Sequence, residues 1–582
     1  MVNSLLERRR GSGPAAAPAS SWLRRHRPDL GAAAVYVALG LVVMGRYLAD
    51  PDGTLSAHLP PDNTWFQWLL SHGAYSVRHL ENPLFSARQN VPDGVNMMAN
   101  TSVLGVTLPL APVTMLAGPR VAYVVWMAGA CAGTAFSAYW VLRRHLVRSR
   151  AAAFAGGALA GFAPGVIHHA NGQPNFVSNF ALPLIVAAVA RLGAGGRVRR
   201  DGVVLGLLVT YQLFVNEELL LITAVGCLVM TIAYAAFRRD EARRRARAFL
   251  GALGVTAAVA GVLCAYPIWF QFHGPMSFAS MPFFTSWGED PLTYLTFSRD
   301  TLAGGPASEA VVGRIEQNSW FGWPLTLVAV LLAVVLWRRS VAARVAAVTA
   351  LAAAVLSLGP VLRVGGEVSG EPGPLAWLPR GLPVLGLLMP SRFTYVVIGA
   401  LVVLVALGWD RLPWRTGRYA IAAALLPLAP TPVPAMPEAP PPVFISSGAW
   451  RPYVPAGSTL VPVPVPSNWA GRETLGWSAA ALHEFPVPEG YFLGPGVHGT
   501  GVMGPARPGT LSRLVTGLLT SGTVPVVSGP DRAAAQAEVR RWNGSVLVLR
   551  ADAAHEPMRI LVEQIFGPPR RVLDVWLWQP VT

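Results

Sequence analysis

The sequence predicts an all-α polytopic membrane domain with about eleven transmembrane helices, followed by a C-terminal extracytoplasmic α/β domain. Three observations support this prediction. Of the 582 residues, 53% are hydrophobic and only 13% are charged, whereas soluble domains usually carry about a quarter charged residues. Long apolar runs recur, and arginines cluster at their ends. The last part of the chain instead alternates patterns typical of short helices and strands.

The basic residues are all arginine, and the formal net charge is +16. Their position between apolar runs is the pattern of cytoplasmic loops, so membrane orientation explains the charge and no nucleic-acid partner is expected. The lack of lysine and the bias toward Ala, Gly, Pro and Val are typical of a high-GC bacterium. The clusters are "RRHLVRSR" (143–150), "RVRRD" (197–201), "RRDEARRRAR" (238–247), "RRSVAAR" (338–344) and "RLPWRTGR" (411–418).

The basic N-terminal segment, residues 1–30, is expected to stay in the cytoplasm. The first apolar run is long enough for a permanent helix, and a signal peptide would show a shorter apolar region. The predicted spans are 31–49, 121–142, 151–167, 176–192, 202–216, 219–237, 248–270, 321–337, 343–359, 393–410 and 418–432. Their odd number places the C-terminal part outside. The shorter run 102–118, with two prolines, predicts a re-entrant or surface-lying helix on the outer side.

The domain boundaries follow from these runs. The membrane domain is predicted over 31–432, with a large first outer loop at 50–120. A Pro-rich linker at 433–446 reads as a semi-rigid spacer. Residues 447–582 are the predicted α/β domain. Within it, "DRAAAQAEVRRWN" and "EPMRILVEQIFG" are typical of helices, whereas "GSVLVLR" and "RRVLDVWLWQPV" are typical of strands.

The sequence offers little sign of a cofactor. The cysteines Cys131, Cys227 and Cys264 lie in apolar runs without a CxxC spacing, so we interpret them as small core residues. The glycines of "GTGVMG" at 499–504 lack a clear preceding strand and following helix, so nucleotide binding is not expected there. No cofactor is predicted; a divalent metal is compatible with the sequence but not indicated.

Asp62, in "PPDNTWFQWL" at 60–69, is the first candidate for chemistry. One interpretation is an N-cap, because aromatic and apolar residues follow it at near-helical spacing. The other is a functional carboxylate in the first outer loop. The two interpretations are compatible, since a carboxylate at a loop-to-helix junction is also well placed to act.

The order of segments resembles the GT-C membrane glycosyltransferases: a cytoplasmic N-terminus, one helix, a large outer loop with "PDNTWFQW", an amphipathic stretch and a short apolar half-span. The stretches "AGFAPGVIHHANGQPNF", "QLFVNEELL", "EQNSWFGWP" and "LLMPSRF" resemble actinobacterial GT-C-like proteins, over most of residues 30–430. The resemblance implies that Asp62 acts as catalytic base on the acceptor or organises the reaction centre. It also implies a polyprenyl-phosphate or polyprenyl-diphosphate sugar as donor.

The second outer loop departs from that resemblance. Many GT-C enzymes carry a second acidic residue there, whereas this chain has His168, His169 and Asn171. The histidine pair is compatible with phosphate binding, with metal binding or with a plain polar interface. Glu217 and Glu218 in "FVNEELLL" are the candidates for the missing acid, because carboxylates near the membrane boundary are costly unless functional or paired. A turn facing water is the alternative.

Three later polar residues are candidates for substrate binding. Arg392 in "MPSRF" begins a span from the outer side, where a guanidinium suits a lipid phosphate. Snorkelling to the interface is the alternative. Glu316 and Asn318 in "EQNSWFGWP" are candidates for hydrogen bonds to a sugar, beside tryptophans that either stack on it or belong to an aromatic belt.

The sequence therefore predicts a membrane glycosyltransferase. It would move a sugar from a polyprenyl-phosphate donor to a cell-envelope glycan, lipid or protein on the outer face of the cytoplasmic membrane. One alternative is a non-enzymatic transporter or envelope-assembly scaffold, although the inverted repeats usual in transporters are not visible. Another is a GT-C-like protein that only binds lipid or glycan.

Overall fold

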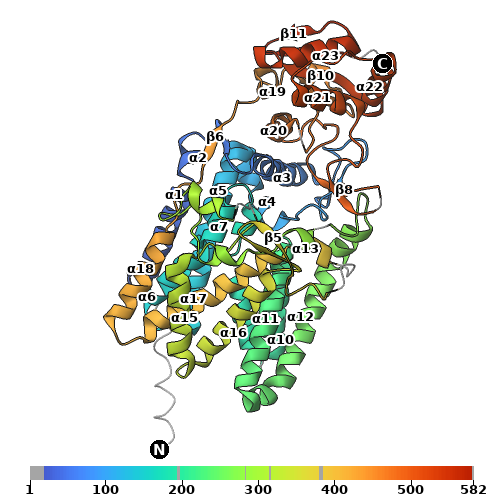
Figure 1. Cartoon of the computed structure of the whole chain (residues 1–582). Helices are drawn as coiled ribbons and strands as arrows, with labels where there is room; N and C mark the ends of the chain where they lie inside the picture. Colours follow the sequence, from blue (N-terminus) through green and yellow to red (C-terminus); the bar gives the residue numbers. More distant parts are fainter. Residues whose placement is uncertain are drawn as a thin grey trace, which may run out of the picture.

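A computed structural model describes residues 19–192, 197–281, 283–312, 316–378, 384–468, 470–497 and 499–579. Most of the predicted N-terminal basic segment, residues 1–18, lies outside this described part. The described chain forms a bundle of long helices with a smaller α/β domain stacked at one end (Figure 1).

A helix occurs at each predicted span. The helices are α1 (Ala19–Val43), α5 (Ala111–His145), α6 (Arg150–Phe162), α9 (Leu182–Arg191), α10 (Val198–Leu213), α11 (Glu217–Phe237), α12 (Arg239–His273), α15 (Gly322–Trp337), α16 (Val341–Ser357), α17 (Thr394–Arg411) and α18 (Arg415–Leu425). Among the described residues, 6 helical stretches are long and apolar enough to cross a membrane. They confirm a helical membrane domain, whereas the count of eleven and the orientation stay predictions.

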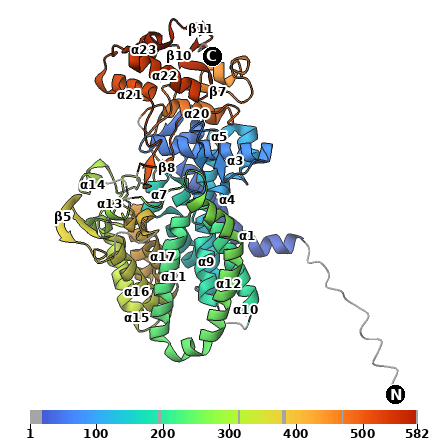
Figure 2. The same cartoon turned by 90° about the vertical axis from the view of Figure 1, so that its right-hand side faces the viewer.

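The arginine clusters and the α/β domain lie at opposite ends of the bundle. The turn between α11 and α12 and the turn between α15 and α16 both point away from the C-terminal domain (Figure 2). Short elements connect the helices, many of them at the end nearer that domain (Figure 1). They are α2 (Gly45–Ala49), α3 (Pro60–His79), α4 (Leu104–Thr107), α7 (Pro164–His169), α8 (Pro174–Val177), α13 (Phe283–Ser286), α14 (Pro306–Ala310), β2 (Phe85–Ser86), β3 (Val95–Asn96), β4 (Val361–Val364) and β5 (Glu367–Pro372).

Helices α5 and α6 approach each other closely because α6 presents glycines one turn apart. A Cβ added at Gly161 would lie 2.4 Å from the carbonyl oxygen of Cys131, and one at Gly157 would lie 2.6 Å from that of Ala135. Small residues four apart let membrane helices pack backbone against backbone. The pair therefore fixes the spacing of α5 and α6.

Replacing Gly161 by leucine should destabilise the bundle by about 1–3 kcal/mol, because the backbone of α5 leaves no room for the side chain. Thermal unfolding of the detergent-solubilised protein measures the loss. Gly129 on α5 is the matched control, since a Cβ there meets nothing within 4 Å. If both variants unfold at the same temperature, the close α5–α6 contact does not limit stability.

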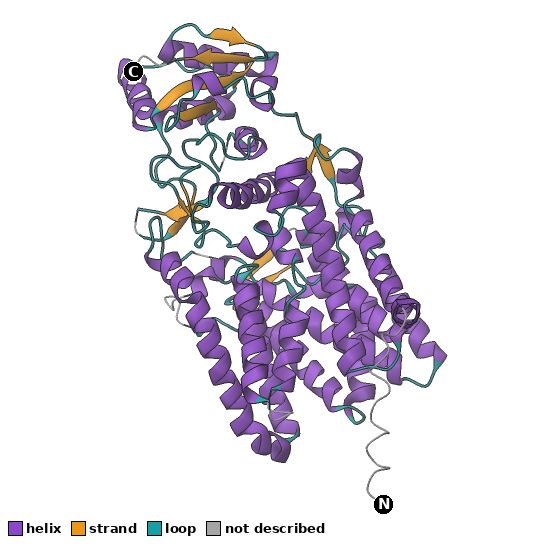
Figure 3. Ribbon diagram, turned by 180° about the vertical axis from the view of Figure 1, so that it is seen from behind, coloured by secondary structure: helices purple, strands orange, loops and turns teal. Residues whose placement is uncertain are grey.

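Helix α3 lies across the end of the bundle, beneath the C-terminal domain (Figure 3). Its residues 63–76 are all buried, because it packs on α5 below and on α20 (Arg472–Ala480) above. The sequence shows aromatic and apolar residues at near-helical spacing after Asp62, and the structure places the resulting helix between two layers.

The apolar run 102–118 is not one re-entrant or surface helix. It is divided between α4 and the first turns of α5, and Gly118 interrupts α5 with φ 82° and ψ 163°. Positive φ is readily adopted by glycine alone, so the chain bends there before the long part of α5 begins.

The C-terminal domain is built on a four-stranded sheet in the order β11-β12-β10-β7. β10 runs parallel to β7 and antiparallel to β12. The four secondary-structure predictions made for this part are confirmed. The strands are β7 (Thr459–Val463), β10 (Gly544–Arg550), β11 (Arg570–Val572) and β12 (Val575–Trp578), and the helices are α19 (Val443–Ser446), α20, α21 (Thr510–Ser521), α22 (Gly529–Arg541) and α23 (Glu556–Phe566).

The Pro-rich linker is tethered to the loops for which an outer position is predicted. β6 (Ala435–Pro437) pairs antiparallel with β1 (Thr54–Ser56) of the first outer loop. Glu438 then accepts two hydrogen bonds from Arg472, at 2.9 and 2.8 Å. Both β6 and the Glu438 carboxylate therefore hold the linker in place, so it is not a free spacer.

A second connection comes from the segment before α21. Its hairpin, β8 (Leu493–Pro495) with β9 (Gly501–Met503), contains most of the glycine-rich stretch "GTGVMG". The backbone N–H of Gly501 donates to the carbonyl of Ser280, at 2.8 Å, and that of Asn90 donates to the carbonyl of Glu489, at 2.7 Å. The C-terminal domain thus reaches down onto the outer loops of the helix bundle.

Candidate functional site

Asp62 lies in the first turn of α3 and binds residues from two distant parts of the chain. Leu59 is the N-cap of this helix, so the N-cap interpretation of Asp62 is wrong. The Asp62 carboxylate instead accepts a hydrogen bond from the Gln173 amide at 2.7 Å and one from the Tyr491 hydroxyl at 2.5 Å. Gln173 belongs to the second outer loop and Tyr491 to the C-terminal domain. Asp62 therefore joins three segments.

A chain of side chains leads from Asp62 into the bundle. The Gln173 amide oxygen lies 2.5 Å from Nδ1 of His169, and Nε2 of His169 lies 2.5 Å from the Asn318 amide oxygen. The Asn318 amide nitrogen donates in turn to the carbonyl of Glu316 at 2.7 Å. The structure thus brings Asp62, His169, Asn318 and Glu316 into one polar network, which holds four of the residues singled out from the sequence.

The carboxyl group of Glu289 binds the backbone of the segment that carries Asn318. It accepts hydrogen bonds from the backbone N–H groups of Asn318 and Ser319, at 3.0 and 2.9 Å, and from the Ser319 hydroxyl at 2.5 Å. Burial raises the pKa of Glu289 to about 8, and these hydrogen bonds oppose the rise. The group fixes the backbone on which Asn318 stands.

Arg392 does not stand free at the start of its helix. Its guanidinium is ion-paired with Glu218 and, at 3.0 Å, with Glu316, and its side chain is only 6% exposed. It also lies over the ring of Phe176, 3.8 Å from the centroid. Burial raises the pKa of Glu316, but the charge and hydrogen bond of Arg392, together with the nearby His169 and His168, outweigh burial and hold that pKa below its usual value. Two carboxylates therefore offset this arginine.

The remaining predicted residues lie around the network. Glu217 accepts a hydrogen bond from Gln271 of α12 at 2.8 Å and points to a different neighbour from Glu218. In the second outer loop, Asn171 donates to Asp300 at 2.9 Å, and Nδ1 of His168 lies 3.9 Å from the same carboxylate oxygen. The two histidines therefore serve different carboxylates: His169 connects toward Asp62 and His168 toward Asp300.

The electrostatics of Asp62 suit a proton acceptor. Burial raises the pKa of Asp62 above its usual value, and the hydrogen bonds from Tyr491 and Gln173 oppose the rise. Burial, together with the nearby Asp62 charge, also raises the pKa of Tyr491, so its hydroxyl keeps its proton and donates it to the carboxylate. Within the described ranges, no group of three or more His, Cys, Asp or Glu residues is placed to hold a metal ion.

Sequence reasoning missed Tyr491, Asp300 and Glu289. Tyr491 is 429 positions from Asp62, in a domain whose sequence shows no recognisable site, so no local signal could have found it. Asp300 ends the stretch "LTFSRD" in a long outer loop, and a search for the acid missing from the second outer loop could have included it. The structure places Asp300 beside that loop.

Comparison with known families adds one match. A family model described as "Domain of unknown function (DUF6311)" matches residues 32–429, more than half of the chain. The chain belongs to the DUF6311 family. The match includes Asp62, His169, Glu316 and Arg392, whereas Tyr491 lies beyond it. In this DUF6311 protein the site is therefore completed by a residue from outside the family domain.

No curated protein matches this DUF6311 chain. Among solved structures, it is similar to the archaeal oligosaccharyltransferase AglB from Archaeoglobus fulgidus in complex with an inhibitory peptide and a dolichol-phosphate, with TM-score 0.49 and 11% identity over 94% of this chain and 72% of that one. The apo form gives TM-score 0.48 at the same identity and coverage. The form tethered to an acceptor peptide gives 0.45 at 13% identity, over 97% of this chain and 75% of that one.

Proposed function

We propose that this DUF6311 protein is a membrane glycosyltransferase of the GT-C type. It transfers a sugar from a polyprenyl-phosphate donor to a hydroxyl group of a cell-envelope acceptor, at the outer face of the cytoplasmic membrane. The observation that carries the proposal is the network at Asp62. One partly buried carboxylate joins the first outer loop, the second outer loop and the C-terminal domain, at the end of the bundle opposite the arginine turns.

In the proposed reaction Asp62 is the general base. The acceptor oxygen attacks the anomeric carbon of the donor while its proton passes to the Asp62 carboxylate. The bond between that carbon and the phosphate oxygen breaks, and its electron pair leaves with the polyprenyl phosphate. A positioned base contributes most when its pKa lies close to the working pH, and burial moves the pKa of Asp62 in that direction.

The Tyr491 hydroxyl marks where an acceptor hydroxyl would bind. It donates to Asp62 with the geometry that an acceptor needs before it loses its proton. We therefore propose that the acceptor takes this position or lies directly beside it. The C-terminal domain, which supplies Tyr491, is then part of the acceptor site.

The ion pairs of Arg392 change the role proposed for this residue. A guanidinium already offset by Glu218 and Glu316 has little charge left for a phosphate. We propose that Arg392 holds both carboxylates in place, with Glu316 and Asn318 directed to the sugar. His168 and Asn171, beside Asp300, are proposed for the phosphate end of the donor. Glu217 is proposed to support the edge of the site through the hydrogen bond that it accepts from Gln271.

Purified protein with a panel of radiolabelled polyprenyl-phosphate sugars tests the proposal. Release of polyprenyl phosphate together with transfer of label to a cell-envelope fraction is the expected result. If no donor of the panel gives transfer of label or release of polyprenyl phosphate, the proposal is contradicted.

Removing the Tyr491 hydroxyl should shift the pH dependence of transfer. Tyr491→Phe keeps the aromatic ring, whose centroid lies 6.3 Å from that of Trp65. It deletes a hydrogen bond that lowers the pKa of Asp62. That pKa then rises further above its usual value. Because the base must be ionised, activity is lost as the pH falls through the raised pKa, so the acidic limb of kcat/KM moves to higher pH. An unchanged limb would mean that Asp62 does not titrate in the rate-determining state.

A lipid- or glycan-binding protein without turnover is the second candidate. One observation favours it: both oxygens of Asp62 and the charge of Arg392 already have partners inside the protein. Such a protein would bind a polyprenyl-phosphate sugar and release it unchanged. The same labelled panel separates the two candidates, since binding without released polyprenyl phosphate supports the second.

A further inference from the structure

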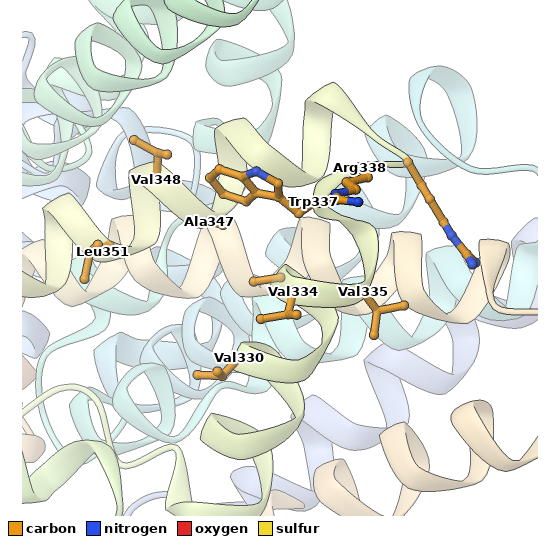
Figure 4. A pocket seen from close by; sticks show the side chains of 10 residues that line it. Val330, Val334, Val335, Trp337, Arg338, Ala347, Val348 and Leu351 are labelled. Carbon is orange, nitrogen blue, oxygen red and sulfur yellow. The ribbon is translucent and has the colours of Figure 1, made fainter.

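A groove opens between α15 and α16, at the end of these helices far from the Asp62 network. Its cavity volume is about 690 Å³, within the range of roughly 300–1,000 Å³ usual for ligand pockets. Side chains of both helices line it, and Figure 4 shows them along the two ribbons. The apolar ones are Val330, Ala333, Val334, Val335, Trp337, Ala347, Val348 and Leu351. Val334 and Leu351 are each 68% exposed, so this wall has no protein cover in the described chain.

Two arginines close one end of the groove. Arg338 and Arg339 follow α15 directly and line the groove, and no carboxylate lines it. Arg344, on the first turn of α16, adds a third positive charge nearby and lies over the ring of Phe237, 4.8 Å from the centroid. The groove is therefore apolar along its length and positive at one end.

The length of α15 places these arginines at the level of lipid headgroups. The helix has 16 residues, which at 1.5 Å each is about 24 Å. The hydrocarbon core of a bilayer is roughly 30 Å thick, so arginines that directly follow a membrane helix of this length would stand near the lipid headgroups. A guanidinium at that depth needs an anionic partner, and the phosphate of a neighbouring lipid is the group available there.

We propose that this groove binds one anionic phospholipid from the leaflet on the side of the arginine clusters. An acyl chain lies on the apolar wall around Val334 and Leu351. The lipid phosphate accepts hydrogen bonds from Arg338 and Arg339. The site is independent of the proposed glycosyl transfer, because it lies at the opposite end of α15 from the Asp62 network.

Native mass spectrometry of the full-length protein tests this site. The protein is taken from nanodiscs with equal phosphatidylglycerol and phosphatidylcholine, and the lipids it retains are counted. Wild type should retain phosphatidylglycerol in preference. Arg338→Gln with Arg339→Gln should weaken that preference by roughly thirtyfold. Equal retention of both lipids by wild type would overturn the proposal.

Two further variants distinguish lipid binding in the groove from a general effect of positive charge. Arg199→Gln with Arg200→Gln removes the same charge from two exposed residues of α10 and should leave the preference unchanged. Val334→Trp with Leu351→Trp fills the groove, keeps the arginines and should abolish retention. An equal loss in the α10 control, or undiminished retention by the filled variant, would overturn the proposal.

Discussion

Asp62→Asn is expected to lower the rate of glycosyl transfer by about 10²–10⁴-fold, the usual contribution of a general base. The substitution removes the proton acceptor but keeps an amide oxygen that can accept the hydrogen bond from Tyr491, so the α3 junction should remain folded. Initial rates of labelled sugar transfer by the purified protein give the measurement.

Asp52→Asn is the matched control for this loss. Asp52 is an exposed carboxylate in the same outer loop, so its substitution makes the same chemical change outside the network. It should transfer at the wild-type rate. Equal rates for Asp62→Asn and wild type would remove Asp62 from the reaction.

Arg392→Met is expected to destabilise the protein by about 3–5 kcal/mol, because it strands the carboxylates of Glu218 and Glu316 in a buried site. Unfolding of the detergent-solubilised protein, followed by thermal shift and by circular dichroism, measures this loss. The exposed Arg415 is the control, and Arg415→Met should change stability by less than about 1 kcal/mol.

Neutralising the stranded carboxylates should restore much of that stability. Arg392→Met combined with Glu218→Gln and Glu316→Gln removes all the charges together, so no uncompensated charge stays buried. No recovery in the triple variant would mean that Arg392 acts through its packing on Phe176 rather than through its charge.

The helical framework could be predicted because membrane helices leave a local signature. Apolar runs of the right length, bounded by arginines, located a part of each long helix. The helix ends were less predictable, since α1 and α5 each begin ten or more residues before the predicted spans 31–49 and 121–142. Some elements of the C-terminal domain, such as β10 and α23, also followed local periodicity, whereas others, such as β7 and α21, were not predicted. The place of α3 could not be read this way. The sequence showed only a near-helical spacing after Asp62, and the tertiary structure alone shows that a second domain covers this helix.

Several residues of the candidate site could be predicted from the sequence, but which of them contact each other could not. Asp62 was singled out at a loop-to-helix junction in the first outer loop and by the GT-C resemblance, and Arg392 by its position at the start of a span. Glu217 and Glu218 were both considered as the second acid. The structure instead pairs Glu218 with Arg392 and joins Asp62 to Gln173 and Tyr491. Hydrogen bonds between residues hundreds of positions apart leave no local periodicity, so a single sequence carries no record of them. The GT-C assignment and the polyprenyl-phosphate donor stay predictions.

We propose that the sugar is transferred at Asp62, next to Tyr491. The most direct test of this proposal is an experimental structure of the protein with a polyprenyl-phosphonate sugar, a donor analogue that cannot release its sugar. We expect the anomeric carbon to lie next to the Asp62 carboxylate and the Tyr491 hydroxyl, with the phosphonate toward His168 and Asn171. If the analogue binds away from Asp62 and the hydrogen bonds of Asp62 with Tyr491 and Gln173 are out of its reach, Asp62 is not the site of transfer.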